Sequence, residues 1–138
     1  MITTVAVGTD GSETAGEAIR QAAEIARRFD AKLVLVSAFE DSNAAAAGSS
    51  EVDWVSNPAA RARAILERTE SELRRSGIDC ETRADSGEAA DVILRLAEEC
   101  DADLLVIGNR GMKRRVLGSV PNTVTHKARC SVLVVKTT

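Results

Sequence analysis

Residues 103–119 read DLLVIGNRGMKRRVLGS, and this stretch indicates the fold class more clearly than any other part of the chain. The apolar run at 103–108 has the length and composition of a strand that is buried on both faces of a sheet. A glycine-punctuated basic loop follows, and Gly118-Ser119 then introduces a helical segment at 119–127. The stretch therefore predicts a strand, a loop and a helix in direct succession.

The same succession recurs along the rest of the chain. Strands are predicted from apolar or alternating runs, and helices from apolar residues at helical spacing between them. The predicted strands are 2–8, 32–39, 78–84, 103–108 and 131–136, and the predicted helices are 12–28, 58–76, 86–100 and 119–127. Strands that alternate with helices form a parallel sheet, and right-handed crossovers restrict it to doubly wound orders. We therefore predict an α/β fold that binds ligands at the carboxyl ends of its strands, where the winding direction reverses.

The composition leads us to expect one cytoplasmic domain over residues 1–138. The chain has 138 residues, a net charge of −3 and 44% apolar residues, which suits a single globular core. Its acidic balance and scarcity of aromatic residues argue against nucleic-acid binding. We find no secretory signal, and no run approaches the roughly 20 apolar residues of a membrane span. Three widely spaced cysteines fit reduced thiols better than a disulfide framework or a zinc site.

The first and fourth predicted strands end at residues suited to a phosphate-bearing ligand. If the winding reverses between these strands, Asp10 faces the loop Gly108–Ser119 across a crevice. Glycines let backbone N–H groups turn toward a ligand, and the helix that begins at Ser119 presents its positive dipole end to an anion. The loop also carries four cations, Arg110, Lys113, Arg114 and Arg115. Simpler interpretations remain open, in which the glycines only form turns and Ser119 only caps its helix.

The chain also resembles the universal stress protein family along nearly its whole length. The resemblance is carried by VAVGTDGS at 5–12, GEAADVILRLAEECDADLLVIGNRG at 87–111 and GSVPNTVTHKARCSVLVVK at 118–136. It implies a single Rossmann-like domain of the adenine nucleotide alpha hydrolase type, with five parallel strands in the order 3-2-1-4-5. It further implies a regulatory role in a stress response, a homodimer joined through the last strand at about Ser131–Lys136, and ATP, or cyclic AMP in some members, in the crevice.

The resemblance implies roles for individual positions of a nucleotide site. Asp10 would lie beside the ribose or a phosphate-bound Mg²⁺, and Thr9 would border the same pocket. Ser37 and Ala38 would offer backbone groups to the adenine, and Gly87 would belong to the loop that closes over the base. The positions nearest the ribose and the phosphates would be Ile107, Gly108, Arg110, Gly111, Gly118, Ser119 and Val120.

The chain departs from the family's nucleotide-binding pattern in one loop. Nucleotide-binding members carry Gly-x2-Gly-x9-Gly-[Ser/Thr], whereas the six residues MKRRVL separate Gly111 from Gly118 here. Three fewer residues shorten the loop by about 10 Å of extended chain. ATP is the expected ligand, and the alternatives are a monophosphate such as AMP or cyclic AMP, or weak nucleotide binding.

Three classes of function are compatible with these features. The leading one is a nucleotide-binding regulator that hydrolyses ATP slowly at most, because no nucleophile or general base is evidently positioned. The second is an interaction protein whose crevice is vestigial and whose protein partner is unknown. The third is a phosphoacceptor domain that uses Asp85 after the third strand, although Asp10 lacks the acidic neighbour that this chemistry requires.

Other conspicuous residues receive structural interpretations. His126 is expected near the end of the last helix, where a cation is favourable, and Asp101 and Asp103 are expected as turn residues at the opposite end of the sheet. Trp54 falls in the segment 40–57, which is predicted to be a mobile loop, and either anchors that loop to the next helix or covers the crevice. The last strand is apolar on both faces and is expected at a sheet edge, which independently favours a two-fold dimer.

Overall fold

A five-stranded parallel sheet forms the centre of the molecule. The computed structural model describes residues 1–9, 13–39, 57–109 and 119–136. Within them the strands run in the order β3-β2-β1-β4-β5, and each neighbouring pair is parallel. The strands are β1 (Thr4–Gly8), β2 (Lys32–Phe39), β3 (Cys80–Ser86), β4 (Leu104–Gly108) and β5 (Ser131–Val135). The predicted α/β class and the predicted strand order are both confirmed.

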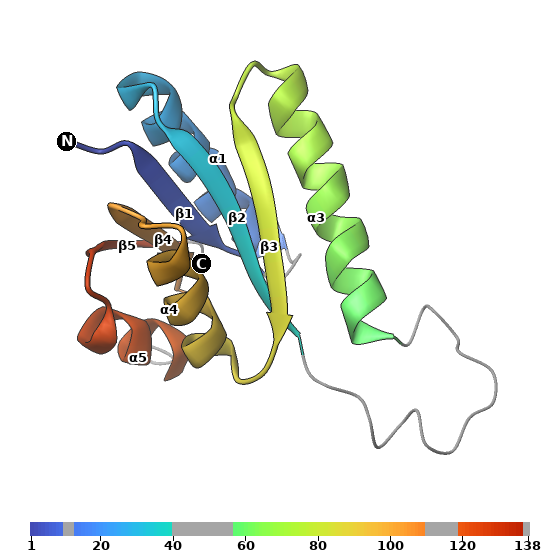
Figure 1. Cartoon of the computed structure of the whole chain (residues 1–138), viewed down its shortest axis with the longest axis vertical. Helices are drawn as coiled ribbons and strands as arrows, with labels where there is room; N and C mark the ends of the chain where they lie inside the picture. Colours follow the sequence, from blue (N-terminus) through green and yellow to red (C-terminus); the bar gives the residue numbers. More distant parts are fainter. Residues whose placement is uncertain (10–12, 40–56, 110–118, 137–138) are drawn as a thin grey trace.

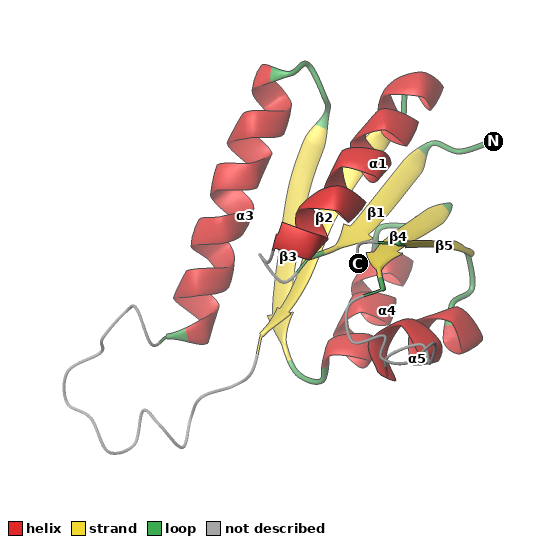
Figure 2. Cartoon of the chain, turned by 180° about the vertical axis from the view of Figure 1, so that it is seen from behind, coloured by secondary structure: helices red, strands yellow, loops and turns green. Residues whose placement is uncertain are grey.

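Helices cover both faces of this sheet (Figures 1 and 2). The described helices are α1 (Glu13–Phe29), α3 (Pro58–Arg75), α4 (Ala89–Glu99) and α5 (Ser119–Lys127). Helices α1 and α3 pack on one face, and α4 and α5 pack on the other. Right-handed crossovers place a helix on one face when the chain moves across the sheet in one direction and on the other face when it moves in the opposite direction. The chain moves from β1 to β2 to β3 in one direction, and from β3 to β4 to β5 in the other.

The apolar strands supply two cores because successive side chains point to opposite faces of a strand. Val5 and Val7 of β1 pack on the α1 side, whereas Ala6 between them packs on the α4 side, and all three are fully buried. Helix α1 meets the sheet through small side chains such as Ala18 and Ala22, which have no exposed surface. These alanines let the helix axis lie close above β1 and β4.

Helix α4 begins three residues later than predicted, at Ala89 instead of Ser86. Ser86 is the last residue of β3, because β3 stays paired with β2 as far as this position. Glu88 takes the N-cap position, where its carboxylate accepts hydrogen bonds from the N–H groups of Ala90 (3.2 Å) and Asp91 (3.3 Å). Serine is a commoner N-cap residue than glutamate, but Ser86 belongs to β3 because it is paired with Phe39 of β2.

The remaining element ends agree with the predicted ones to within about two residues. Helix α3 begins at Pro58 and is capped by Asn57, and Gly77 follows its end with a φ of +84°. A positive φ is the conformation that glycine adopts without steric cost at a helix end. The predicted loop at 40–57 lies, apart from Asn57, outside the described residues, and Trp54 lies outside them too.

The two edges of the sheet differ in character. Strand β3 is half-buried and polar along most of its length, whereas β5 has the half-buried apolar residues Val132, Leu133 and Val134. Both strands were predicted at edges, and the strand order confirms this. Across the described ranges, no helix has both the length and the apolar character that a bilayer crossing requires.

Candidate functional site

Three buried polar residues gather at the carboxyl edge of the central strands. They are Thr9, Ser37 and Asn109, which are 7%, 5% and 3% exposed, and among the described residues no other polar or charged residue is buried. Thr9 follows β1, Ser37 lies near the end of β2, and Asn109 follows β4. Strands β2 and β4 flank β1, where the winding direction reverses. This edge is therefore the position at which doubly wound sheets bind ligands.

Backbone hydrogen bonds hold two of these residues in line with the sheet. The N–H of Thr9 donates to the carbonyl oxygen of Val36 at 3.0 Å, and the N–H of Asn109 donates to that of Val135 at 3.0 Å. The sheet pairing thus continues one residue past the end of β1 and β4. The two side chains are positioned by the sheet itself.

Gly87 closes the adjacent corner of this edge. Its N–H donates to the carbonyl oxygen of Phe39 at 3.0 Å, which ties the β3–α4 turn to the end of β2. Its φ is +135°, and a Cβ atom at this position would lie 2.9 Å from Cγ2 of Val92. Both features restrict the position to glycine. The turn therefore lies beside Phe39 at the end of β2, just beyond Ser37 and Ala38.

An exposed ion-pair network braces the same turn. Arg95 of α4 contacts the carboxylate of Asp85 at 2.8 Å and that of Glu99 at 3.2 Å. The hydrogen bond from Arg95, followed by one from the N–H of Ser86, lowers the pKa of Asp85 below its ordinary value. The carboxylate on which the phosphoacceptor hypothesis depends is thus already engaged by a cation and a backbone donor.

The positions predicted near the ribose and the phosphates are only partly described. Ile107 is 3% exposed and packs in the core on the α4 side, as half-buried Val120 does at its margin. Gly108 ends β4, and Ser119 is the first residue of α5. Asp10, Arg110, Gly111 and Gly118, together with the cations Lys113, Arg114 and Arg115, lie outside the described residues.

Asp103 does more than the predicted turn role at the opposite end of the sheet. Its Oδ2 accepts hydrogen bonds from the N–H of Thr3 (2.8 Å), the hydroxyl of Thr3 (3.0 Å) and the N–H of Thr4 (3.0 Å). These donors lower the pKa of Asp103, with the N–H of Thr3 contributing most. Asp101 adopts a φ of +54° after α4, as a turn residue, and His126 lies in the last turn of α5.

The cysteines show no sign of activated thiols. Burial raises the pKa of Cys80 to about 11, and burial also raises the pKa of Cys100 and of Cys130. A reactive thiol needs the opposite shift, toward the thiolate. Burial therefore disfavours the thiolate form of all three cysteines.

Asn109 is the residue at this edge that sequence reasoning missed. The sequence pattern assigns it to the glycine loop, although it immediately follows the strand-ending Gly108. The available signal was its place after a continuously apolar strand, directly at the reversal of winding. Its burial came only with the pairing of β4 to β5.

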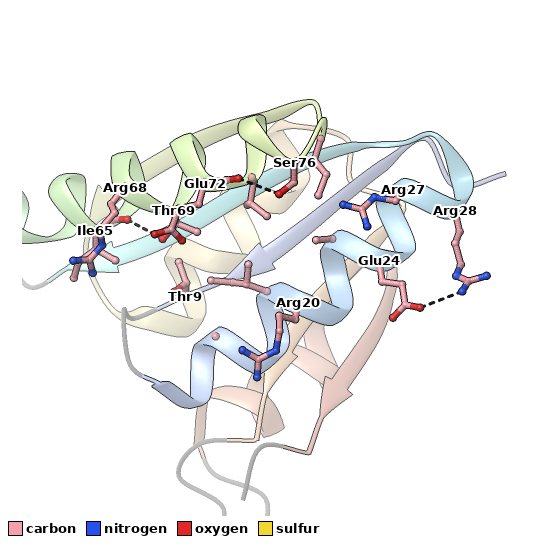
Figure 3. Close-up of a pocket in the computed structure, with 15 residues that line it drawn as sticks. Thr9, Arg20, Glu24, Arg27, Arg28, Ile65, Arg68, Thr69, Glu72 and Ser76 are labelled. Carbon is pink, nitrogen blue, oxygen red and sulfur yellow. Dashed lines mark hydrogen bonds and ion pairs between the residues drawn. The ribbon is translucent and has the colours of Figure 1, made fainter.

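A cavity of about 690 Å³ lies beside this edge, between α1 and α3 (Figure 3). Of the predicted site residues that the structure describes, Thr9 alone lines it. The cavity extends away from the strand ends along both helices, toward Arg27 and Ser76. It is thus a separate feature from the predicted crevice and meets it at Thr9.

Known proteins share both the sequence and the architecture of this chain. The sequence model of the universal stress protein family matches residues 1–136. A universal stress protein of Mycobacterium tuberculosis is 39% identical over 142 residues, which cover 98% of this chain and 97% of the relative. A solved universal stress protein in complex with cAMP is 35% identical with a TM-score of 0.78, covering 99% of this chain and 98% of its own. A solved universal stress protein of Archaeoglobus fulgidus in complex with dAMP is 27% identical with a TM-score of 0.73, covering 97% of this chain and 98% of its own. The family's sequence model matches the chain almost from end to end, and the strand order is the one that the family resemblance implied. The chain therefore belongs to the universal stress protein family.

Proposed function

We propose that this protein is an adenine-nucleotide-binding regulator that acts in a stress response. The observation that carries the proposal is the group of buried polar side chains, Thr9, Ser37 and Asn109, at the edge where the sheet reverses. Doubly wound sheets bind their ligands at this edge, and ligand sites place a few polar groups where they can orient the ligand. Two solved relatives are complexes with cAMP and dAMP, which supports an adenine nucleotide as the ligand.

The described elements suit the two ends of such a ligand. The backbone of Ser37 and Ala38 would face the base, and the turn at Gly87, tied to Phe39, would close over it. Helix α5 begins at Ser119, and the free N–H groups and positive dipole of its first turn favour the phosphates. Asp10, which follows Thr9, would hold Mg²⁺ indirectly with the phosphates.

We propose ATP as the principal ligand and a monophosphate as the second candidate. The basic residues Arg110, Lys113, Arg114 and Arg115 favour a polyphosphate, because each adds a cation to the loop beside the helix terminus. The six-residue spacing between Gly111 and Gly118 favours a shorter ligand, and the complexes of relatives with cAMP and dAMP agree with one phosphate.

We further propose a cytoplasmic homodimer that binds and signals but does not turn over substrate efficiently. The half-buried apolar residues Val132, Leu133 and Val134 lie on the open edge strand β5, where pairing with a second copy would cover them. The three free thiols suit a reducing compartment. Binding without efficient catalysis fits a protein that relays the presence of nucleotide to a partner.

Thermal unfolding with separate nucleotides tests the proposal. Mg-ATP, ADP or cyclic AMP at about 100 times its dissociation constant adds about 2.7 kcal/mol, which raises the midpoint of a domain of this size by about 5 °C or more. A shift with Mg-ATP supports the principal ligand, and a shift with cyclic AMP alone supports the monophosphate. No shift with any of the three, in protein free of co-purified nucleotide, refutes nucleotide binding.

A matched pair of double variants locates the binding. Gly111→Ala/Ser119→Ala alters the phosphate side of the predicted site, and we expect it to abolish most of the shift. Gly77→Ala/Ser71→Ala makes the same two kinds of change at and just after the end of α3, at the opposite edge of the sheet, and we expect the shift to persist. An equal loss in both pairs would contradict the proposed location.

A further inference from the structure

The cavity between α1 and α3 has the features of a groove for a protein segment. Helix α1 packs over β1 and β4, and α3 packs over β3 and β2, so the two helices stand apart above the sheet. Each helix lines the gap with one stripe of residues at helical spacing, from Gly16 to Arg28 on α1 and from Ile65 on α3 to its C-cap residue Ser76. We call this cavity the α1–α3 groove.

The groove combines apolar and cationic walls. Ile19 of α1 and Leu73 of α3 are only partly buried against the core, and Ile65 adds a third half-exposed apolar side chain. The charged lining residues are four arginines (Arg20, Arg27, Arg28 and Arg68) and two glutamates (Glu24 and Glu72). The lining is therefore positive, although the whole chain carries a net charge of −3.

Two of these arginines are available to a ligand. Arg20 is paired with Glu17, and Arg28 with Glu24. Within the described part of the chain, neither Arg27 nor Arg68 has an ion pair or a hydrogen bond from its side chain, and both residues are exposed. Figure 3 shows Arg68 and Arg27 toward opposite ends of the groove.

These observations favour a peptide over a small anion. The walls are helix sides, whose backbone N–H groups are already bonded within each helix, so an anion can be held only by the arginine side chains. The stripe on α3 extends over eleven residue steps, or about 17 Å, which matches about five residues of extended chain. The described lining contains no aromatic residue on which a nucleic-acid base could stack.

We propose that the α1–α3 groove binds an acidic segment of a partner protein. Apolar side chains of that segment would pack against Ile19, Ile65 and Leu73, and its carboxylates would pair with Arg27 and Arg68. Because the lining is positive, charge complementarity favours a partner segment with negative charge. The apolar side chains of the lining favour a segment that also carries apolar side chains. The groove is distinct from the nucleotide site apart from Thr9 at one end. Segment binding can therefore occur whether or not the protein binds nucleotide.

A fluorescein-labelled decapeptide of alternating leucine and aspartate is the probe, and fluorescence anisotropy is the readout. We expect saturable binding of this peptide to the wild-type chain without nucleotide. Reversing both free arginines in Arg27→Glu/Arg68→Glu should weaken binding by about tenfold or more. Peptides with lysine in place of aspartate, or serine in place of leucine, should bind similarly weakly.

The matched control is Arg63→Glu/Arg75→Glu. It makes the same change in net charge, and like the test pair it alters one arginine in a last helical turn and one in the body of a helix. Neither residue lines the groove, and Arg63 lies on the side of α3 next to β3. We expect the control pair to bind the probe within about twofold of wild type, since charges away from the interface act only weakly. Circular dichroism of both double variants checks that each is folded.

Three results would overturn the proposal. The first is the absence of saturable binding of the labelled peptide at wild-type protein concentrations up to about 1 mM, where a dissociation constant corresponds to only about 4 kcal/mol. The second is an equal loss in the two double variants, and the third is equal affinity for the serine peptide. A change of oligomeric mass in Arg27→Glu/Arg68→Glu alone would assign the groove to a second copy of this chain and also refute a separate partner. Because the test variants lie outside the nucleotide site, these outcomes are independent of the thermal-shift result.

Discussion

Gly87 is the position at which one added carbon atom has the best-defined consequence. Its φ of +135° belongs to a region that side chains rarely adopt, and a Cβ atom would lie 2.9 Å from Cγ2 of Val92. Val92 is itself 3% exposed in the core on the α4 side, so it has little room to move away. Gly87→Ala therefore adds backbone strain and overpacking at the same site.

The magnitude follows from these two contributions. Backbone strain of this kind costs about 1–3 kcal/mol, and overpacking a buried side chain costs about 1–3 kcal/mol. With partial relaxation we expect the free energy of unfolding to fall by about 3 kcal/mol. Gly77→Ala isolates the backbone contribution, because Gly77 has a φ of +84° and a Cβ atom there would meet no atom within 4 Å. That control should cost about 1 kcal/mol.

Urea unfolding at 25 °C, extrapolated linearly to water, measures both variants on one scale. The double variant Gly87→Ala/Val92→Ala removes the atom that the new Cβ would meet, so its loss should be smaller than the sum of the single losses by about 1 kcal/mol or more. The reasoning is refuted if Gly87→Ala costs no more than Gly77→Ala, or if the double variant is additive.

Three further predictions concern other parts of the molecule. Because Asp103 has its pKa lowered from 3.8 on folding, its ionised form stabilises the fold fully above that pH, and the contribution is lost as the pH falls through the lowered value. The stability difference between wild type and Asp103→Asn, from urea unfolding, should therefore be present at pH 7 and shrink below about pH 4; a constant difference would contradict this. Cys80, which is 1% exposed with its pKa raised to about 11, should react with iodoacetamide at pH 8 far more slowly than Cys100 or Cys130 in peptide mass spectra, and equal labelling would show that it is not buried. Sedimentation velocity should give twice the mass of one chain. Val134→Asp on β5 should reduce it to the mass of one chain, whereas Ala84→Asp on the opposite edge should leave it unchanged. An unchanged mass in Val134→Asp would exclude pairing through β5.

The order of elements was accessible from the sequence because each element has a local signature. Strands β2 and β4 are apolar runs bounded by polar residues or glycine, and both were predicted within one residue of their observed ends. Helix α5 was also predicted with both ends correct. The start of α4 was wrong because its serine belongs to β3, whose end is set by pairing with β2 and not by local preference.

The candidate site was accessible only in part. Thr9, Ser37 and Gly87 were named from the family resemblance, and the structure places each of them at the carboxyl edge of the sheet. Asn109 was missed because its burial depends on the bond from its N–H to Val135, a residue 26 positions away. A residue pattern does not record a contact of that range.

The sequence by itself determined the α/β alternation, because burial on one or two faces imposes a period that short segments display locally. It also determined membership of the family, through motifs spread along the whole chain. Only the tertiary structure brought Thr9, Ser37 and Asn109 together and joined Asp103 to the start of β1. It also separated α1 from α3 by a groove whose lining includes Arg27 and Arg68, two arginines without an ion pair among the described residues. The physical reason is that local periodicity specifies which face of an element is buried, whereas its neighbours are specified by the packing of segments that are far apart in the chain.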